Sequence, residues 1–443
     1  MANCYFISCH RAQDHVADLF RFLYRPDHLY VIHCDPKAPA PLRDLVARLA
    51  ACFPNVVSLP AQPYSWGGYS MVTTLWRALE AALAHAPDWS HFFWLSEQHL
   101  PLFAQEDTRW TLEAGCSYSD AAPVAGMWSG GQADVLHRFS LNFRELPGVG
   151  AFPTGPQAVD WTMPPYHGSN WMALDRGVCA LMLERAGPAA DLFAHSVQPD
   201  ETMPQTLLMA AAAEGRARVR GWNPTYVAWP NLCGNPDMLC TMDNVAAARA
   251  EGRLFIRKRP PVMPEAMRAE VEAMAAFSDA ALMERLGMAP PMPETRAALA
   301  GPLMARVAAL AAGRQGYVVE RFDCAELNNV PAFYVTMRPP AGPATPPGLR
   351  LCVLSEDMRT FKVLIVVRPP PDGDWAPVAV GPHQAYPLRL RVYGLFLERE
   401  VAVAEEADAG FVMLGDDGDL VPLDDTIRRY LLHMDALAGP PDA

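Results

Sequence analysis

The sequence predicts an α/β fold in which helices cover both faces of a mostly parallel sheet. Over residues 4–95, short apolar runs alternate with segments whose apolar residues recur at helical spacing. The strand-like runs are apolar throughout and do not alternate with polar residues, as expected when both faces of a parallel sheet are buried. Strands and helices that alternate in this way along the chain are typical of a parallel α/β sheet.

The predicted elements follow one another in a regular order. Strands are expected at residues 4–9, 28–33, 55–59 and 91–95, and helices at 14–24 and 41–52. A third, long helix is expected to open with the run Trp66–Ser70 and to reach about His85. Pro26 ends the first helix, because proline lacks the amide hydrogen that a helix interior needs. A strand at 169–174 then precedes a helix that begins at Asp175.

The remaining chain predicts a long loop region and a second domain. Residues 117–165 are irregular and rich in Gly, Pro and Trp, which is typical of a functional loop or lid. Prolines near 260–264 mark a boundary. We predict a first domain over 1–262, a helical connector over 263–315 and a C-terminal α+β accessory domain over 316–443. In the accessory domain, strands are expected at 332–337, 349–354, 361–367, 387–402 and 410–414, and a helix at 424–437.

Composition excludes several classes of protein. The net charge of −13 gives no general attraction for nucleic acid, so an anionic ligand would need a local basic cluster. The ten cysteines form no CxxC pair and no zinc spacing, which favours reduced thiols in a cytoplasmic protein. No signal peptide and no apolar stretch of membrane-spanning length is visible, although peripheral contact with a membrane stays open.

Three common nucleotide and hydrolase motifs are absent from the sequence. Cys9-His10-Arg11 follows the first strand where a dinucleotide-binding fold would place GxGxxG. There is no GxxxxGK[ST] phosphate loop and no GxSxG nucleophile elbow. In open α/β sheets, ligands bind at the carboxyl ends of the strands. Asp35, Gly67, Ser96 and Gln98 follow predicted strands and are therefore expected to share that edge.

Glu201, in the run Pro199-Asp-Glu, is the candidate general base if the protein is an enzyme. The sequence places it at the start of a helix, where the helix dipole favours a carboxylate. The alternative is an ordinary glutamate of a first helical turn. The distinction depends on what the rest of the chain supplies.

An ordered set of short runs resembles a known family. The runs are Tyr5–His10, Tyr30–Lys37, Trp66–Ser70, Leu95–Leu102, His167–Trp171, Pro199–Glu201 and Leu254–Lys258. In order and spacing they resemble the core-2/I-branching β-1,6-N-acetylglucosaminyltransferases, a family that also contains the peptide O-xylosyltransferases, over about residues 3–260. The resemblance implies a GT-A-like, that is Rossmann-like, fold and an inverting transfer from a UDP-sugar without a metal. A soluble relative of bacterial type fits best.

The resemblance also implies roles for individual residues. Glu201 corresponds to the family's base, Lys258 and Arg257 to the basic residues that neutralise the diphosphate, and Asp35 to an aspartate of the nucleotide pocket. His99 is a departure, since family members usually have aspartate there, and it leaves the donor preference open.

Other candidate residues keep a structural alternative. His10 and Gln98 are candidates for the donor site, but His10 is equally well explained as a structural histidine. Asp35 can read the uridine or cap the turn that follows it. Trp66 and Gly67 allow a close backbone approach to a ligand or simply begin a helix. For an acceptor site the candidates are Arg138 and Trp229, together with Trp161, although core packing explains many tryptophans.

The expected function is transfer of a sugar, N-acetylglucosamine first and xylose second, from UDP to a hydroxyl of a glycan or glycolipid-type acceptor, with a β-linkage. No metal or other cofactor is expected, because the first 260 residues lack an Asp-x-Asp pair. The Asp-Gly-Asp runs at 372–374 and 417–419 are interpreted as solvated turns. The alternatives are a non-catalytic carbohydrate-binding or scaffold protein and a UDP-sugar hydrolase.

Overall fold

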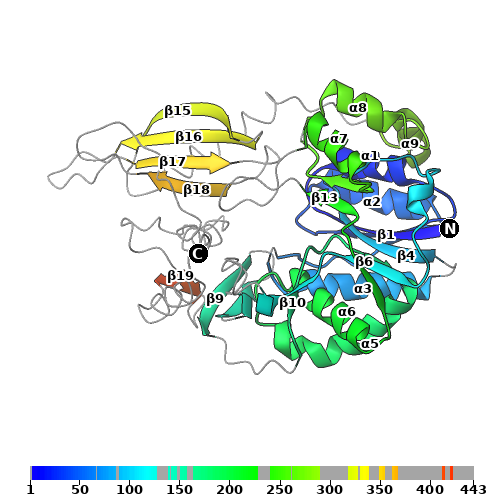
Figure 1. Ribbon diagram of the computed structural model, residues 1–443. Helices are drawn as coiled ribbons and strands as arrows, with labels where there is room; N and C mark the ends of the chain where they lie inside the picture. Colours follow the sequence, from blue (N-terminus) through cyan, green and yellow to red (C-terminus); the bar gives the residue numbers. More distant parts are fainter. Residues whose placement is uncertain are drawn as a thin grey trace.

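The computed structural model describes one continuous α/β unit and several strands of the C-terminal part. The described residues are 2–65, 67–85, 89–126, 138–139, 141–146, 150–156, 163–227, 240–260 and 262–289, followed by strands between 318 and 422. Figure 1 shows a twisted central sheet with helices on both sides. The predicted α/β architecture is therefore confirmed for the N-terminal domain.

The central sheet has seven strands, and most neighbours run parallel. Across the sheet they are β12 (Arg218–Gly221), β6 (Cys116–Ser119), β11 (Ala173–Asp175), β4 (Trp89–Ser96), β1 (Ala2–Cys9), β2 (Leu29–Cys34) and β3 (Val56–Ser58). The block β4-β1-β2-β3 is parallel, as is the pair β12-β6. Only β11 runs antiparallel to its neighbours within this described sheet. This strand is shorter than the one expected at 169–174.

Two groups of helices cover the two faces of the sheet. One face carries α1 (Gln13–Leu23), α2 (Ala40–Cys52) and α9 (Asp279–Leu286). The other carries α3 (Ser70–Ala84), α5 (Arg176–Phe193) and α6 (Met203–Ala213). Asp175 caps α5 by accepting a hydrogen bond from Gly177 N, so the predicted start of this helix is confirmed.

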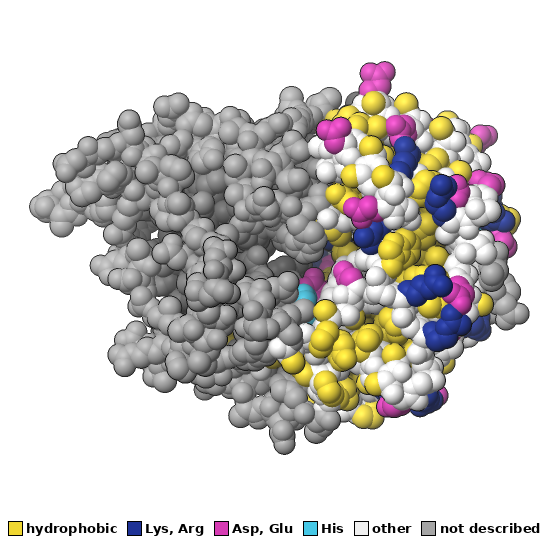
Figure 2. Space-filling model, in the orientation of Figure 1, with side chains coloured by type: hydrophobic (Ala, Val, Ile, Leu, Met, Phe, Trp, Pro, Cys, Tyr) yellow, Lys and Arg dark blue, Asp and Glu magenta, His cyan; other side chains and the backbone are white. Residues whose placement is uncertain are grey.

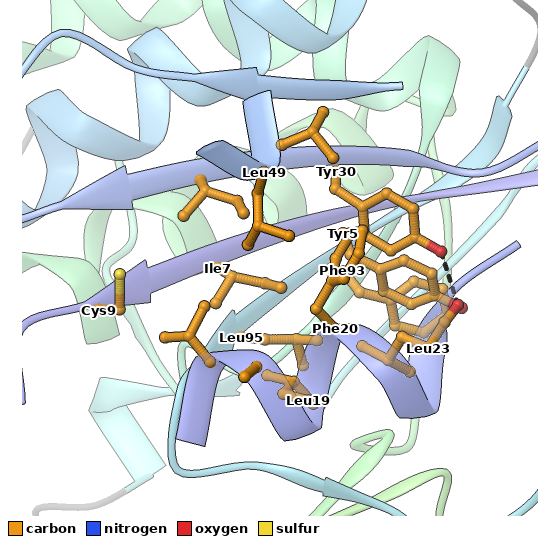
Figure 3. Close-up of a cluster of buried hydrophobic side chains, with 14 of the residues drawn as sticks. Tyr5, Ile7, Cys9, Leu19, Phe20, Leu23, Tyr30, Leu49, Phe93 and Leu95 are labelled. Carbon is orange, nitrogen blue, oxygen red and sulfur yellow. Dashed lines mark hydrogen bonds between the residues drawn. The ribbon is translucent and has the colours of Figure 1, made fainter. Parts of the chain in front are cut away.

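Helical spacing explains how α1 contributes to the core. Val16, Leu19, Phe20 and Leu23 all lie on the face that meets the sheet, and each is fully buried. Figure 3 shows several of these side chains against Tyr5 and other side chains of the central strands. Burying each such side chain contributes about 1.5–3 kcal/mol to the free energy of folding. This cluster therefore holds α1 against the central strands, whose ends form the site.

A second, smaller sheet extends the carboxyl edge of the first. Its strands are β13 (Thr225–Val227), β14 (Phe255–Arg257) and β5 (Leu100–Pro101), with α7 (Met242–Ala250) packed beside them. Because β5 follows β4 directly, it brings the end of β14 next to the loop at 96–99. The family-like run Leu254–Lys258 therefore lies beside the loop that follows β4.

An ion cluster ties α8 (Glu265–Glu272) to α1. Arg21 is fully buried, and its guanidinium lies 2.7 Å from both Asp18 and Glu272. Arg259 joins the cluster through a 2.7 Å contact with Asp18. Although the sequence assigns these helices to a connector, α8 and α9 pack onto the first domain. The predicted domain limits themselves stay a prediction.

The segment expected to be irregular contains regular elements. A hairpin is formed by β8 (Leu141–Leu146) and β9 (Gly150–Pro156), and a small ladder by β7 (Ala122–Pro123) and β10 (Tyr166–His167). The segment also contains a short 3₁₀ turn, η2 (Val124–Gly126). Two further 3₁₀ turns lie outside it, η1 (Thr108–Trp110) and η3 (Pro199–Glu201). The prediction that 117–165 is irregular throughout is therefore wrong.

The C-terminal part contains an antiparallel four-stranded sheet. Its strands are β15 (Val318–Leu327), β16 (Val330–Arg338), β17 (Leu349–Leu354) and β18 (Lys362–Val367), and a separate pair is β19 (Val412–Leu414) with β20 (Leu420–Pro422). Four of the expected strands coincide with β16, β17, β18 and β19, whereas β15 and β20 were not expected. The expected strand at 387–402 and the helix at 424–437 lie outside the described residues.

The described surface mixes both signs of charge. On the face in Figure 2, basic and acidic side chains are interspersed over the described half. At the edge of the central sheet, for example, Arg218 and Arg220 both pair with Glu113. None of the described helices is long and apolar enough to span a membrane.

Candidate active site

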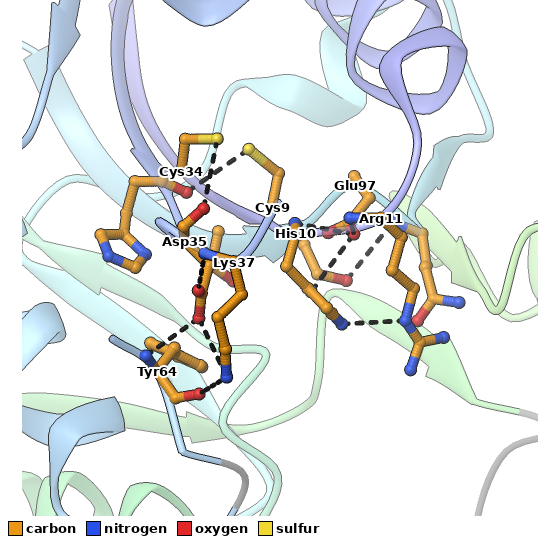
Figure 4. Close-up of polar contacts among 12 residues, drawn as sticks. Cys9, His10, Arg11, Cys34, Asp35, Lys37, Tyr64 and Glu97 are labelled. Atoms are coloured by element: carbon orange, nitrogen blue, oxygen red, sulfur yellow. Dashed lines mark hydrogen bonds and ion pairs between the residues drawn. The ribbon is translucent and has the colours of Figure 1, made fainter. Parts of the chain in front are cut away.

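The carboxyl ends of β1, β2 and β4 bring three polar segments together. Cys9 is in register with Cys34, and Ser8 with Ser96. The residues that follow each strand therefore meet at one edge, where Figure 4 shows His10, Asp35 and Glu97. The expectation that residues after the strands share this edge is confirmed for these segments.

Asp35 holds the backbone around it. One carboxylate oxygen accepts a hydrogen bond from Lys37 N at 2.7 Å, and the other accepts one from Tyr64 N at 2.9 Å. The Lys37 ammonium lies 3.5 Å from the same carboxylate and donates to Tyr64 O at 2.8 Å. Of the two interpretations, this geometry favours the cap: Asp35 joins the turn after β2 to the loop that leads into α3.

Glu97 lies beneath the turn that joins β1 to α1. Its Oε1 accepts hydrogen bonds from the backbone amides of His10 and Arg11, both at 3.1 Å. The His10 ring is about half exposed, with Nδ1 3.4 Å from Glu97 Oε1 and Nε2 accepting a hydrogen bond from Arg11. His10 therefore stands at the surface of the site, while Glu97 is 1% exposed.

His99 is enclosed by aromatic rings. Its Nδ1 accepts a hydrogen bond from Ser96 N at 3.0 Å, and the ring meets Trp171 edge-on at 4.7 Å. Burial, and after it the charge of Arg257, lowers the pKa of His99 well below its usual range. His99 is therefore a neutral ring inside the site wall.

The basic run at 257–259 divides between two tasks. Arg259 is 1% exposed and turns toward α1, where it pairs with Asp18 and Asp14. Arg257 lies 4.2 Å over the ring of Trp171, a cation–π contact. Lys258 is buried between them, and its carbonyl accepts a hydrogen bond from Cys240 N.

A left-handed turn holds Glu201. Gln198 has φ = 50°, and Pro199–Glu201 then form the single 3₁₀ turn η3, two residues before α6 begins. Glu201 thus precedes the helix instead of opening it. Gly67, with φ = 73°, accepts a hydrogen bond from Gln198 N at 2.8 Å, and a Cβ there would lie 3.2 Å from Val197.

The Glu201 side chain faces a buried arginine. Arg138 Nη1 lies 2.6 Å from Glu201 Oε2 and 3.1 Å from Nδ1 of His167. The same His167 nitrogen is 3.1 Å from the Glu201 carbonyl oxygen. The Glu201 side chain is 26% exposed and that of Arg138 only 8%. The carboxylate is thus held from one side and open on another.

Asp200 has the opposite surroundings. It is 2% exposed, and its Oδ2 accepts a hydrogen bond from Asn170 at 2.7 Å. Burial first, and the neighbouring Glu201 charge second, raises the pKa of Asp200 to about 7, while Arg138 opposes the shift. Two adjacent carboxyl groups therefore differ in environment.

Two side chains connect the halves of the site. The guanidinium of Arg257 stacks on the ring of Trp171, and the neighbouring Asn170 donates a hydrogen bond to Asp200. Tyr64 joins the same edge through its backbone amide, which donates to Asp35, and burial first, then the charge of Asp200, raises the pKa of its phenol. The Glu201 turn, the β4 end and the β14 end therefore belong to one site.

Some candidates lie outside this description. Trp66, Trp161 and Trp229 are not among the described residues, so their proposed contacts stay predictions. Gln98 lies at the edge, where its carbonyl accepts a hydrogen bond from Arg259 N at 2.8 Å. Within the described residues, no three His, Cys, Asp or Glu side chains are grouped as a metal site.

Sequence reasoning did not select five residues that shape this site. Glu97, Asn170 and His167 lie in the family-like runs, and Asp200 directly precedes Glu201. The runs that carry the resemblance could therefore have pointed to these four residues. Tyr64 lies in no such run, and only the fold brings it to the edge. Together these groups can hold a carboxylate near an incoming hydroxyl and cations near a departing anion.

The sequence comparisons agree with this arrangement. The family described as Core-2/I-Branching enzyme matches residues 4–247, which is more than half of the chain. A xylosyltransferase of Ciona intestinalis is 26% identical over 247 residues, covering 50% of this chain and 27% of that protein. The N-acetyllactosaminide β-1,6-N-acetylglucosaminyl-transferase of Mus musculus is 26% identical over 203 residues, covering 44% and 50%.

A third relative extends the same pattern. The xylosyltransferase oxt of Drosophila pseudoobscura pseudoobscura is 25% identical over 294 residues, or 59% of this chain and 32% of that protein. The chain thus spans between about a quarter and a half of the length of these relatives. The family match, the parallel sheet and the grouping of the family-like runs at one edge lead to the same conclusion. This chain belongs to the core-2/I-branching enzyme family.

Proposed function

We propose that this chain is a glycosyltransferase that moves a sugar from UDP to an acceptor hydroxyl with inversion at the anomeric carbon. The observation that carries the proposal is the Glu201 turn. A partly open carboxylate, oriented by a buried arginine, lies in one site with the basic pair Arg257 and Lys258. Family membership supports the same reaction class.

The proposed step is a single displacement. The acceptor oxygen forms a bond to the anomeric carbon while the bond from that carbon to the diphosphate breaks. Glu201 takes the hydroxyl proton, and the bonding electron pair leaves on the diphosphate oxygen. Arg257 and Lys258 stabilise the charge that develops there, because cations in a shielded site act strongly on a nascent anion.

Arg138 has a positioning role in this mechanism. Its 2.6 Å contact holds one carboxylate oxygen of Glu201 and leaves the other for the acceptor. The contact with His167 fixes the guanidinium in turn. Arg138 thereby orients the base, and it also lies where an acceptor sugar could receive a hydrogen bond.

The donor sugar we propose is N-acetylglucosamine, with xylose as the second choice. The named relatives are N-acetylglucosaminyl- and xylosyltransferases, which supports both sugars. The acceptor class we propose is a glycan or glycoconjugate with a free hydroxyl. His99 makes the site wall neutral at this point, and its effect on the choice of sugar is measurable.

A donor panel tests the proposal. UDP-N-acetylglucosamine, UDP-xylose, UDP-glucose and UDP-galactose are compared by thermal shift and by UDP release, with and without β-galactoside and serine-peptide acceptors. We expect one donor to stabilise the protein most and to release UDP faster with acceptor. Release at the same rate without acceptor would instead identify a hydrolase, and no binding of UDP or any donor would refute the proposal.

Independence from a divalent metal is also a proposal. It is supported by the basic pair at the β14 end, which can meet the charge of the diphosphate. We expect turnover to persist in EDTA. Activity that disappears with EDTA and returns with Mn²⁺ would contradict it.

A further inference from the structure

The carboxylate of Glu97 has one oxygen that the described fold does not use. Glu97 is 1% exposed, and its Oε1 accepts the hydrogen bonds from the His10 and Arg11 amides. Its Oε2 is buried and has no hydrogen-bond partner within the part of the chain that the structure describes. A buried acceptor without a partner is costly, and native proteins rarely keep one without a reason.

Capping the turn does not require this oxygen. A glutamine at position 97 would offer the same carbonyl to His10 N and Arg11 N without burying a charge. Asp35, at the same edge, differs in this respect, because both of its oxygens accept backbone hydrogen bonds. Among the three rim carboxylates Asp35, Glu97 and Glu201, Glu97 thus combines the deepest burial with an unused oxygen.

The neighbouring residue has the complementary feature. Gln98 is 5% exposed, and its Nε2 donor is likewise buried without a partner among the described residues. A second buried polar group without a partner among the described residues therefore lies at the carboxyl end of β4. A carboxylate oxygen such as Glu97 Oε2 can only accept, so the group that would satisfy it must donate, as a hydroxyl does.

The position relative to the basic pair indicates which hydroxyl is involved. Arg259 N donates to Gln98 O at 2.8 Å, and β14 pairs with β5 through Ile256 and Leu100. The segment at 97–98 is thus joined directly to the segment that carries Arg257 and Lys258. If those cations hold the diphosphate, the ribose and the transferred sugar, which are bonded to it, are the parts of the donor that we expect beside the segment at 97–98.

From this geometry we propose that Glu97 Oε2 accepts a hydrogen bond from a donor-substrate hydroxyl adjacent to the diphosphate. The inference rests on the proposed function, since it requires a nucleotide sugar in this site. The hydroxyl belongs either to the ribose or to the transferred sugar. Glu97 is then a specificity-determining residue, and Asp35 is left with its structural task.

The test compares Glu97→Gln with the wild-type protein. The substitution retains the turn-capping carbonyl and converts the unused acceptor into a donor. A lost hydrogen bond to a charged group weakens binding by about tenfold or more. Without ligand, the melting temperature should stay within about 2 °C of the wild type, because the turn is preserved. Glu113→Gln, the same change at an exposed sheet edge, is the matched control and should leave affinity unchanged.

Calorimetric titration with UDP and with the preferred UDP-sugar separates the two sources. Weaker binding of both ligands assigns the ribose, and 2′-deoxy-UDP should then lose affinity on the wild type but no further on the variant. Weaker binding of the UDP-sugar alone assigns the transferred sugar. If Glu97→Gln is poorly folded, Glu97→Asp is tested in its place. The aspartate side chain is one methylene shorter, so its carboxylate oxygen no longer reaches the position of Glu97 Oε2.

Two results would overturn the inference in distinguishable ways. If both ligands bind Glu97→Gln, or its Asp replacement, within about twofold of the wild type, Glu97 does not contact the donor, while the proposed function stands. If the wild-type protein binds neither UDP nor a UDP-sugar, the proposed function fails and this inference fails with it.

Discussion

At the residue scale, the site depends on two adjacent carboxyl groups in unlike surroundings. Asp200 is buried against Asn170, whereas Glu201 is partly open and paired with Arg138. The sequence Asp-Glu alone does not show which of the two carboxyl groups is buried. The difference arises because consecutive side chains of the 3₁₀ turn η3 point in different directions, so that Asp200 is buried while Glu201 stays partly exposed.

Asp200→Asn should change how stability depends on pH. The folded-state pKa of about 7 lies above the unfolded value, so the folded protein holds a proton that the unfolded chain releases. Stability contributed by this group is therefore full at low pH and is lost as pH rises from about 4 to about 7. Asparagine cannot ionise and removes this loss.

Urea unfolding of both proteins at about pH 5 and about pH 8 measures this effect. The stability of Asp200→Asn relative to wild type should rise between the two pH values, by on the order of 1–4 kcal/mol. Parallel pH profiles for the two proteins would show that Asp200 is ionised in the folded state at neutral pH.

At the element scale, the loop before α3 supports the turn before α6. The Gly67 carbonyl accepts a hydrogen bond from the Gln198 amide, and a Cβ added at Gly67 would lie 3.2 Å from Val197. The sequence indicated a close backbone approach at Trp66-Gly67-Gly68. The approach that the structure describes at Gly67 is to the Glu201 turn. Sequence cannot supply this partner, since it lies 130 residues away.

Gly67→Ala should therefore affect activity as well as stability. A side chain at φ = 73° is strained by about 1–2 kcal/mol, and here it also pushes on Val197. Gly215, at φ = 71° with open space around its Cα, provides a control with the same backbone cost. Thermal unfolding and UDP release are measured for both variants.

Both alanine variants should lose similar stability, but only Gly67→Ala should slow the reaction, by about tenfold or more if the base moves. Equal activity in the two folded variants would mean that Gly67 does not position Glu201.

The basic run at 257–259 shows a further limit of sequence reasoning at this scale. In the sequence, three consecutive cations suggest one basic cluster. In the structure, however, Arg259 forms ion pairs with Asp14 and Asp18 of α1. Periodicity predicted α1 correctly, including its buried face, because burial follows local spacing. Which cation meets which carboxylate depends on tertiary contacts that local spacing does not encode.

At the scale of the whole molecule, the N-terminal domain uses more chain than the prolines near 260 suggest. Leu282, Met283 and Leu286 of α9 are buried in the same cluster as α1 and α2. The ion cluster joins α8 to Arg21 and Arg259. The prolines at 260–264 suggest a domain boundary. The end of the hydrophobic core, by contrast, is visible only from the packing of α8 and α9 on the first domain.

Truncation tests this extent. A chain of residues 1–289 should fold, because it keeps α8 and α9 on the core. A chain of residues 1–262 should aggregate or lose several kcal/mol of stability, since it exposes apolar core and leaves Arg21 without Glu272. Circular dichroism and size-exclusion chromatography read the outcome. A monomeric 1–262 chain with unchanged melting temperature would place the boundary at the prolines.

The central claim is that Glu201 is the base of a sugar transfer, and Glu201→Gln tests it most directly. Acceptor-dependent UDP release is measured for wild type and variant with the preferred donor. Because general-base catalysis contributes about 10²–10⁴-fold, the rate should fall at least about 100-fold, while UDP affinity stays within about threefold. A folded Glu201→Gln protein that keeps more than about a tenth of the wild-type rate would contradict the claim.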